Sequence, residues 1–322
     1  MRAPDFWQHQ GPWATVLTPL SWCFDGVGVL RRVVVRPQPV GCPVVCVGNL
    51  VAGGAGKTPV ALALGDALMA RGRTVHFLTR GYGGRSRGPL SVDGRRHDAA
   101  EVGDEALLLV ARAPTWVAAD RVAGAEAAVA AGADIVVMDD GFQNPSLAKD
   151  LSVVVVDGDY GFGNGRVMPA GPLREGIAPG LRRAQAVVVM DGNSEWDDYL
   201  APHGVAVLHA VLEPESDCAA LAGKRVLAFA GIARPEKLTA TLEAMGCQVV
   251  ASHGFADHHP YDADEIMTLV EKSSRLDAVP VTTAKDHVRL PKEARPMVEV
   301  LRVRLSWANP ALLDNVLGTL DP

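Results

Sequence analysis

Residues 48–58 read GNLVAGGAGKT, and this stretch decides how the rest of the chain is interpreted. An apolar, β-branched run (43–47) precedes it, and a helical run (59–71) follows it and ends at Gly72. In such a loop the backbone N–H groups converge on phosphate oxygens, and the glycines let the chain approach a ligand closely. Val51 stands where the strict pattern has glycine, but the GGAGKT core and its strand–loop–helix setting remain. The sequence therefore predicts a phosphate-binding loop.

This loop supplies most of the candidate nucleotide-binding residues. Lys57 is expected to reach the β- and γ-phosphates of ATP, and the Thr58 hydroxyl is expected to bind Mg²⁺. The candidates within the loop are Asn49, Gly53, Gly54, Ala55, Gly56, Lys57 and Thr58. The alternative, a glycine-rich turn with a chance Lys-Thr pair, leaves the flanking strand and helix unexplained.

A second motif, DIVVMDDGFQ (134–143), ends a buried strand with Asp139 and Asp140. A wound sheet presents ligand-binding groups at the carboxyl ends of its strands. We therefore expect one of the two acids to hold the metal, directly or through water. The alternative is that these carboxylates cap the following turn.

Apolar strand-like runs alternate with helical stretches along most of the chain. Runs that are apolar throughout are typical of parallel strands covered on both faces. The predicted strands are 43–47, 74–79, 134–140, 151–157 and 186–190, and a second series is 225–231, 247–252 and 279–283. The predicted helices are 59–71, 121–131, 235–245 and about 263–274. This alternation predicts an α/β fold, a wound parallel sheet of the P-loop NTPase type with a second, smaller α/β domain.

The domain boundaries follow from the same pattern. Residues 1–36 form a leader, 37–205 the nucleotide-binding domain and 206–322 the smaller domain. The junction falls within 191–220, where polar and acidic residues show little periodicity.

Two acid-containing segments precede helical runs. Asp104 in Gly103-Asp104-Glu105 is a natural N-cap, and Asp120 before Arg121 allows the same interpretation. Capping alone would explain both acids if the phosphate-binding loop were not also present.

Two loops carry further cations. Residues 80–87 (RGYGGRSR) follow the second strand and form either a solvated turn or an anion-binding rim. Residues 158–180 form a long glycine- and proline-rich loop with Arg166, Arg174 and Glu175. Loops of this length inside compact domains are usually functional or disordered.

The segment Phe255–Tyr261 (FADHHPY) brings several histidines together. His253, His258 and His259 raise the possibility of zinc, but no cysteine lies near them and no closed set of four ligands is visible. A histidine beside an aspartate can instead orient or accept a proton near neutral pH. Asp262 and Glu265 are typical of a capping box for the next helix.

The leader contains an apolar helical stripe. Trp13, Leu17, Leu20, Phe24 and Val27 recur at helical spacing, and Arg31, Arg32 and Arg36 follow. The segment is too short to span a bilayer, and Pro19 and Asp25 interrupt it. It is typical either of an amphipathic helix in the membrane interface, against an anionic surface, or of a helix docked on the protein's own core.

Composition excludes several classes of protein. The chain has 322 residues, 48% apolar and 21% charged, with a net charge of −6, so it is globular and not a general nucleic-acid binder. Its five scattered cysteines predict reduced thiols in a cytosolic compartment. The N-terminal residues lack the pattern of a secretory signal, and nothing points to a protein partner.

Taken in order, these motifs resemble those of the tetraacyldisaccharide 4′-kinases, the lipid A kinases of Gram-negative bacteria. The resemblance covers nearly the whole chain, as far as TTAKDHVRL (282–290), and rests on GNLVAGGAGKTP, TRGYGG, VGDEA, VAADR, DDGFQN, GNGRVMPAGPLRE and FADHH. It implies transfer of the ATP γ-phosphate to the 4′-hydroxyl of a tetraacylated glucosamine disaccharide 1-phosphate. It also implies a peripheral protein on the cytoplasmic face of the inner membrane.

The resemblance also implies roles for particular residues. Asp104 and His258 would form a catalytic dyad, in which Asp104 accepts the hydroxyl proton and His258 tunes or relays it. Thr58 with Asp139 or Asp140, supported by Glu105, would hold Mg²⁺, and Lys57 and Arg121 would offset charge on the phosphoryl group. The expected substrate residues are Arg80, Tyr82, Gln143, Arg174 and Glu175. The family usually reads DDGFQH, and because Asn144 replaces that histidine, it receives no catalytic role.

Three alternatives remain, and the first is a P-loop GTPase or metallochaperone of the same broad class. A P-loop GTPase would carry Asn-Lys-x-Asp, whereas the nearest string is Ala284-Lys285-Asp286; a metallochaperone would carry a Cys/His cluster near the loop. A soluble small-molecule kinase or ligase would use the leader as an ordinary core helix. A non-enzymatic membrane scaffold would not need Lys57, Thr58 and the paired acids together.

Overall fold

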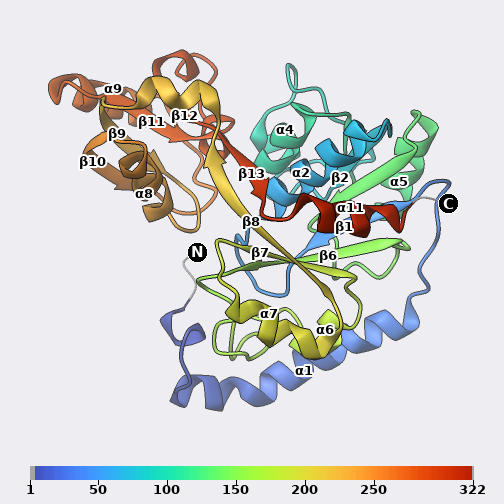
Figure 1. Cartoon of the computed structure of the whole chain (residues 1–322). Helices are drawn as coiled ribbons and strands as arrows, with labels where there is room; N and C mark the ends of the chain where they lie inside the picture. Colours follow the sequence, from blue (N-terminus) through green and yellow to red (C-terminus); the bar gives the residue numbers. More distant parts are fainter. Residues whose placement is uncertain (1–3, 321–322) are drawn as a thin grey trace.

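The computed structural model describes residues 4–320, and its largest element is a nine-stranded sheet (Figure 1). Neighbouring strands pair in parallel, except that β13 with β8 and β3 with β4 are antiparallel. In spatial order the strands are β13 (Val303–Trp307), β8 (Ala206–Pro214), β7 (Ala186–Met190), β6 (Leu151–Asp157), β1 (Val44–Gly48), β5 (Ile135–Asp139), β2 (Val75–Thr79), β4 (Thr115–Val117) and β3 (Leu90–Ser91). The predicted wound sheet of the P-loop type is confirmed.

Helices cover this large sheet because its central strands are apolar on both faces. Every residue of β1, β2, β5, β6 and β7 is buried. The associated helices are α2 (Lys57–Ala70), α3 (Ala99–Val102), α4 (Asp104–Val110), α5 (Arg121–Ala130), α6 (Ile177–Leu181), α7 (Glu195–Leu200) and α11 (Pro310–Gly318). Helix α2 lies close to the sheet at Gly65, where a Cβ would stand 2.5 Å from the ring of Phe77.

A second sheet of four parallel strands forms the smaller part of the molecule. Its order is β10 (Gln248–Gly254), β9 (Arg225–Ala230), β11 (Val279–Thr283) and β12 (Glu299–Leu301). The side chains of β9 alternate: Val226, Ala228 and Ala230 join a cluster with α8 (Glu236–Ala244), whereas Leu227 and Phe229 join one with α9 (Ala263–Arg275). The predicted capping box of α9 is present.

The two sheets do not divide the chain at residue 205. Strands β8 and β13 lie C-terminal to that position, yet they pair with each other in the large sheet (Figure 1). The strands of the small sheet fall between them, at residues 225–301. Ion pairs also join the two parts, since Lys237 Nζ lies 2.9 Å from Asp191 and 3.3 Å from Asp157.

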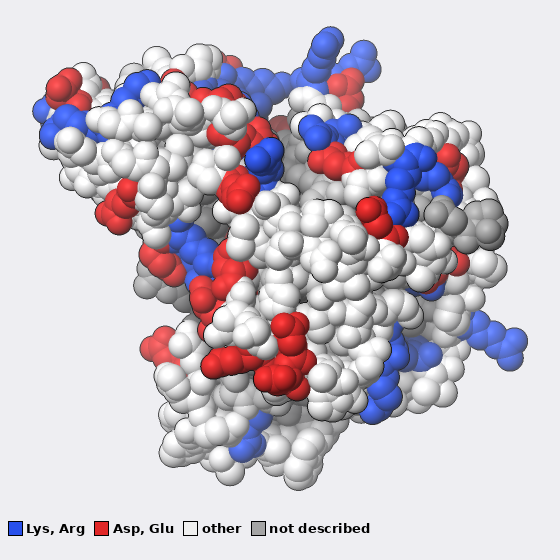
Figure 2. Space-filling model, viewed as in Figure 1, with Lys and Arg blue, Asp and Glu red and all other residues white. Residues whose placement is uncertain are grey.

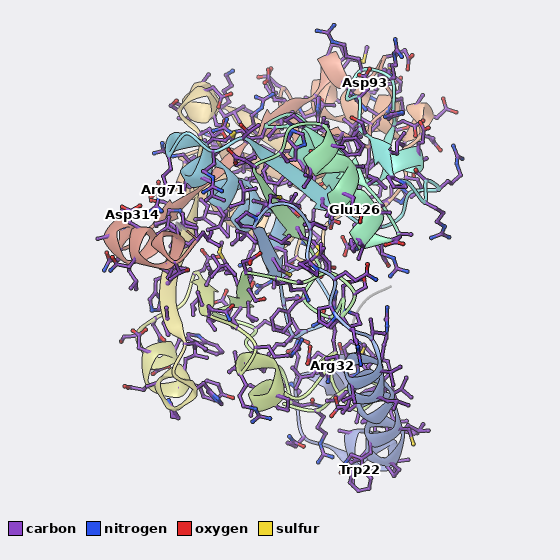
Figure 3. All side chains as sticks on the ribbon, turned by 90° about the vertical axis from the view of Figure 1, so that its right-hand side faces the viewer. Trp22, Arg32, Arg71, Asp93, Glu126 and Asp314 are labelled. Atoms are coloured by element: carbon purple, nitrogen blue, oxygen red, sulfur yellow. The ribbon has the colours of Figure 1, made fainter. Side chains whose placement is uncertain are left out.

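Helix α1 (Pro12–Val34) packs against the molecule through small and polar side chains. Ala14 and Ser21 are its buried residues. Ser21 Oγ donates to Val167 O at 2.7 Å and accepts from Ala170 N at 3.1 Å, and the Arg32 guanidinium lies 3.2 Å from Glu175. The apolar side chains face outward; in Figure 3, Trp22 lies at the outer side of α1.

The apolar stripe expected from the sequence is therefore not part of the protein core. Trp13, Leu20, Phe24 and Val27 are 44–67% exposed, and only Leu17 is half-buried. Trp22 and Val33 are 72% and 77% exposed. Figure 2 shows few charged residues on the lower face, where Figure 1 places this helix. Within residues 4–320, no helix has both the length and the hydropathy needed to cross a bilayer.

The remaining elements are short. They are α10 (Ala284–His287) and the 3₁₀ helices η1 (Asp5–Trp7), η2 (Ala201–His203), η3 (Ser216–Leu221) and η4 (Arg295–Met297).

Candidate active site

The phosphate-binding loop connects β1 to α2 at the carboxyl edge of the large sheet. Gly53 and Gly56 have φ of 122° and 85°, values that favour glycine. Asn49 Nδ2 and Lys57 Nζ both donate to Gly53 O, at 3.2 and 3.3 Å. These contacts give the loop a defined shape and hold the Lys57 ammonium over it.

Thr58 and Asp139 meet at the base of this loop. The Thr58 hydroxyl donates to Asp139 Oδ2 at 2.8 Å. Asp139 is 1% exposed, and its Oδ1 has no hydrogen-bond partner among the described residues. Burial and the charge of Glu105 raise the pKa of Asp139 to about 7, although the Thr58 hydrogen bond acts in the opposite direction. An orphaned carboxylate oxygen beside a hydroxyl is suited to a hard cation such as Mg²⁺.

Asp140 has a different set of partners. Its backbone φ is 52°, and its carboxylate contacts Arg174 Nη1 at 2.9 Å and Lys57 Nζ at 3.8 Å. Burial opposes ionisation, but the charges of Lys57 and Arg174 prevail and hold the pKa of Asp140 below its usual value. Of the two adjacent acids, Asp139 is thus the one that lies against Thr58, and Asp140 is neutralised by cations.

Gln143 and Glu175 link the phosphate-binding loop to the 158–180 loop. Gln143 Nε2 donates to Asn49 O at 2.8 Å and to Glu175 Oε1 at 3.2 Å. Glu175 is 1% exposed and is paired with Arg183 and Arg32. Both are expected substrate residues, and in the structure their side chains also contact groups within the protein.

Arg121, Asp120 and Asn144 each take a local role. The Asp120 side chain caps α5, as the sequence predicts, by accepting from Val122 N and Ala123 N. Arg121 is 4% exposed and donates to Ala118 O, and its Nε has no partner among the described residues. Burial, and next the charge of Arg80, lowers the pKa of Arg121 to about 10. Asn144 Oδ1 accepts from Ser146 N at 3.0 Å and closes a turn.

The expectation that Asp104 is an N-cap is wrong by one residue. Gly103 is the N-cap of α4, and Asp104 is its first helical residue. Gly103 has φ of 86°, and a Cβ there would lie 2.6 Å from Tyr82 O, so only glycine suits this position. Asp104 Oδ1 accepts from Glu105 N at 2.9 Å, which leaves Oδ2 for a distant partner.

That partner is His258, from the loop that follows β10. His258 Nδ1 lies 2.9 Å from Asp104 Oδ2, so the contact joins the small-sheet part to the large-sheet part. Asp104 is 3% exposed; burial opposes its ionisation, but the His258 hydrogen bond and the nearby cations keep its pKa below the usual value. The structure therefore brings together the two members of the expected dyad, with Asp104 ionised at neutral pH.

Glu105 connects this pair to the phosphate-binding loop. Burial and the charge of Asp104 raise the pKa of Glu105, whereas Lys285 and Lys57 lower it. Tyr82 is 63% exposed, and its ring packs edge-on against His258 with centroids 5.4 Å apart. Arg80 is exposed at the start of the same loop.

Lys285 and Arg289 are residues of this site that sequence reasoning missed. Lys285 Nζ lies 3.3 Å from His258 Nε2 and 3.7 Å from Glu105 Oε1, and Arg289 Nε lies 3.6 Å from Asp104 Oδ2. Both follow β11, whose carboxyl end faces the site. A charged residue soon after a buried parallel strand, the kind of signal that singled out Asp139 and Asp140, would have found Lys285, which lies in α10 directly after β11. Arg289 follows α10 and carries no such signal.

The other histidines of this region have separate partners. His253 contacts Lys272 Nζ at 2.6 Å, and His259 contacts Glu265 at 3.0 Å while stacking on Phe255. The structure does not bring the three histidines of the zinc hypothesis together.

The β1–loop–α2 unit, the acids at the end of β5 and the Asp104–His258 pair define a P-loop protein with an acid–histidine pair beside its phosphate-binding loop. Residues 13–321 match the family model of LpxK, the tetraacyldisaccharide-1-P 4′-kinase. The chain belongs to this family.

The sequence similarity to individual relatives extends over nearly the full length of both chains. The chain is 54% identical to the tetraacyldisaccharide 4′-kinase of Rhodospirillum rubrum, with 99% of each chain covered. It is 53% identical to that of Rhodospirillum centenum, covering 99% of this chain and 97% of the relative. The solved structure of LpxK from Aquifex aeolicus in complex with ATP has the same fold, with a TM-score of 0.78 at 24% identity over 96% of this chain and 99% of that one.

Proposed function

We propose that this chain transfers the γ-phosphate of ATP to the 4′-hydroxyl of a tetraacylated glucosamine disaccharide 1-phosphate, a step in lipid A biosynthesis. The observation that carries this proposal is the 2.9 Å contact between His258 Nδ1 and Asp104 Oδ2. Asp104 of this pair is the residue before Glu105, and the charge of Lys57 in the phosphate-binding loop lowers the pKa of Glu105. Family membership supplies the identity of the acceptor.

The loop residues would bind the triphosphate. Backbone N–H groups of Gly53–Gly56 and the Lys57 ammonium would contact phosphate oxygens, and Asn49 would hold the loop through Gly53. Arg121 is buried, and its Nε has no hydrogen-bond partner among the described residues. Its guanidinium would add positive charge near the transferring group. Phosphoryl transfer requires this kind of positioning and charge neutralisation above all.

The Thr58–Asp139 pair fits a resident Mg²⁺ ion. The Thr58 hydroxyl and the orphaned Asp139 Oδ1 would be ligands, with Asp140 and Glu105 in support. When bound by these residues, Mg²⁺ would supply positive charge that offsets the charge of the phosphate groups.

The Asp104–His258 pair would handle the acceptor proton. Asp104 is ionised and can take the proton of the 4′-hydroxyl, but it is only 3% exposed. The His258 side chain is 26% exposed, so it is the member of the pair that solvent and substrate reach more easily. We infer that the proton passes to Asp104 with His258 as relay.

The acceptor would be held at the rim of the site. Arg80 and Tyr82 are exposed beside His258 and are the best placed of the expected substrate residues. Arg174 is partly exposed next to Asp140, whereas Gln143 and Glu175 would act by holding the 158–180 loop in place.

Helix α1 would place the enzyme on the cytoplasmic face of the inner membrane. Its exposed face carries Trp13, Leu20 and Trp22, and the exposed Arg31 and Arg36 lie at its C-terminal end. An apolar face next to cations is suited to the interface of an anionic bilayer, where a four-chain lipid acceptor resides.

The direct test is a transfer assay. The purified protein is incubated with Mg²⁺, γ-labelled ATP and the tetraacylated disaccharide 1-phosphate, and label on the lipid is scored. Label on the lipid with ATP, and little with GTP, is the expected result. Absence of lipid labelling would refute the proposal, and release of phosphate from GTP without lipid labelling would favour a GTPase.

Replacing Trp13, Leu20 and Val27 together with Ser should weaken binding to anionic vesicles by about tenfold or more, because each large apolar side chain contributes about 1.5–3 kcal/mol when buried. All three are exposed, so ATP affinity and melting temperature should remain near wild type. Sedimentation with vesicles measures the binding.

Met267→Ser with Met297→Ser is the matched control, since these side chains are 40% and 47% exposed in the small-sheet part. A triple variant that aggregates or melts far lower than this control would show that the apolar face of α1 belongs to the protein's own packing.

A further inference from the structure

The loop that carries His258 has an unusual backbone. His258 has φ of 59°, in the left-handed region that residues other than glycine seldom adopt. Its side chain nevertheless has to stay within hydrogen-bond distance of Asp104, which comes from the other sheet. Such a conformation persists only where the surrounding structure holds it.

Arg289 contacts two backbone carbonyls next to His258: that of the following residue, and that of Gly231, which accepts from the His258 N–H. Its Nη1 donates to His259 O at 3.1 Å, and its Nη2 donates to Gly231 O at 2.9 Å. Gly231 O is also the acceptor for the backbone N–H of His258, at 3.1 Å. One planar guanidinium thus fixes the carbonyl that anchors His258 and the carbonyl of the next residue.

Asp286 in turn fixes Arg289. Asp286 is fully buried, and its Oδ1 accepts from Arg289 Nη2 at 2.6 Å, from Tyr261 Oη at 2.7 Å and from Gly231 N at 2.7 Å. The Thr283 hydroxyl donates to Oδ2 at 2.6 Å. Arg289 is 5% exposed by side chain, so its charge is paired and its orientation is determined by this network.

The fit around Gly231 is close as well. A Cβ at that position would lie 2.8 Å from Ala256 O and 3.1 Å from His259 Cβ. The β9–α8 turn and the His258 loop therefore pack directly on one another, with the Arg289 guanidinium at their junction.

We propose that Arg289 is a positioning residue for the transfer reaction: it holds the left-handed backbone at His258 so that the imidazole stays on Asp104. This inference rests on the proposed function for its kinetic consequence, but its structural part does not depend on the acceptor. Arg289 holds His258 through backbone contacts, and its Nε also lies 3.6 Å from Asp104 Oδ2, so the test has to separate positioning from charge.

The test compares Arg289→Gln and Arg289→Lys with Arg295→Gln in the full-length protein. Arg295 is the matched control because it also donates to two backbone carbonyls, Leu290 O and Val288 O, in the same part of the chain but away from His258. Arg289→Gln should lower kcat by about tenfold to a hundredfold, because small displacements of a reacting group are costly. KM for ATP should stay within about twofold of wild type.

Arg289→Lys separates positioning from charge. Lysine keeps a positive charge near Asp104 but cannot contact both carbonyls in one plane. It should therefore recover only part of the lost kcat, whereas full recovery would show that charge alone matters and would overturn the proposal. It also supplies the comparison if Arg289→Gln does not fold.

Histidine-labelled ¹⁵N NMR gives a readout independent of activity. The His258 ring signals, assigned by their loss in His258→Ala, should shift in both Arg289 variants and stay unchanged in Arg295→Gln. Unchanged His258 signals, or a kcat in Arg289→Gln equal to that of Arg295→Gln, would overturn the proposal. If wild-type protein labels no lipid, the proposed function fails, and the NMR comparison still decides whether Arg289 positions His258.

Discussion

Asp104→Asn should lower kcat by about 10²–10⁴-fold, because an amide cannot accept the acceptor hydroxyl's proton. Its oxygen can still accept from Glu105 N, so the local hydrogen bond at the start of α4 remains. His258→Ala should also lower kcat, and the double variant should be far less than additive if the two residues act as a unit. ATP affinity should survive in all three. The measurements are transfer kinetics and ATP binding, at a temperature where each variant is folded.

Asp98→Asn is the matched control for the Asp104 variant. Asp98 is exposed and is a genuine N-cap, since its side chain accepts from Glu101 N at 2.9 Å at the start of α3. Asparagine caps about as well as aspartate, so this variant should keep wild-type kcat. If the Asp104→Asn variant is as active as the Asp98→Asn variant, Asp104 has no catalytic role.

Lys57→Ala and Thr58→Ala should each lower activity by about 10²-fold or more, because Lys57 would supply positive charge to the phosphates and Thr58 would be a ligand of Mg²⁺. The Lys57 side chain is 10% exposed and contacts Gly53 O and Asp140, and the Thr58 hydroxyl contacts Asp139. None of these contacts belongs to the apolar core, so thermal melting should show a folded protein.

Lys224→Ala and Thr268→Ala are the corresponding controls. Both residues are exposed in the small-sheet part, far along the chain from the loop. Near-normal turnover in Lys57→Ala or Thr58→Ala, at the level of these controls, would contradict the assignment of the loop.

The local elements of the fold could be predicted from the sequence because each carries its own signal. Continuous apolar runs mark β1, β5, β6 and β7, and glycine after a helical stretch marks the end of α2. The pairing of β8 with β13 could not be predicted, because all strands of the small sheet lie between them in sequence and neither strand carries a mark of its partner. β4 has only three residues, too few for a visible period.

The candidate site likewise contains parts that the sequence predicts from local motifs and parts that it does not. The loop residues and the acids after β5 are recognisable from their local motifs. The approach of His258 to Asp104 depends on how two sheets pack, so residue patterns alone did not reveal it, and it was expected only from the family resemblance. The start of α4 was placed one residue late, at Glu105 instead of Asp104, because the φ of 86° at Gly103 is a property of the folded backbone.

Helix α1 is attached by its polar side, and this has a practical consequence for handling the protein. Deleting the helix would remove the hydrogen bonds of the Ser21 hydroxyl with Val167 O and Ala170 N. It would also remove the Arg32 ion pair of the buried Glu175. The outward apolar residues make no such contacts, as the exposure of Trp22 shows (Figure 3). Polar replacements on the outer face are therefore the better route to a detergent-free preparation, since a shortened chain would lose the support that the helix gives to the 158–180 loop.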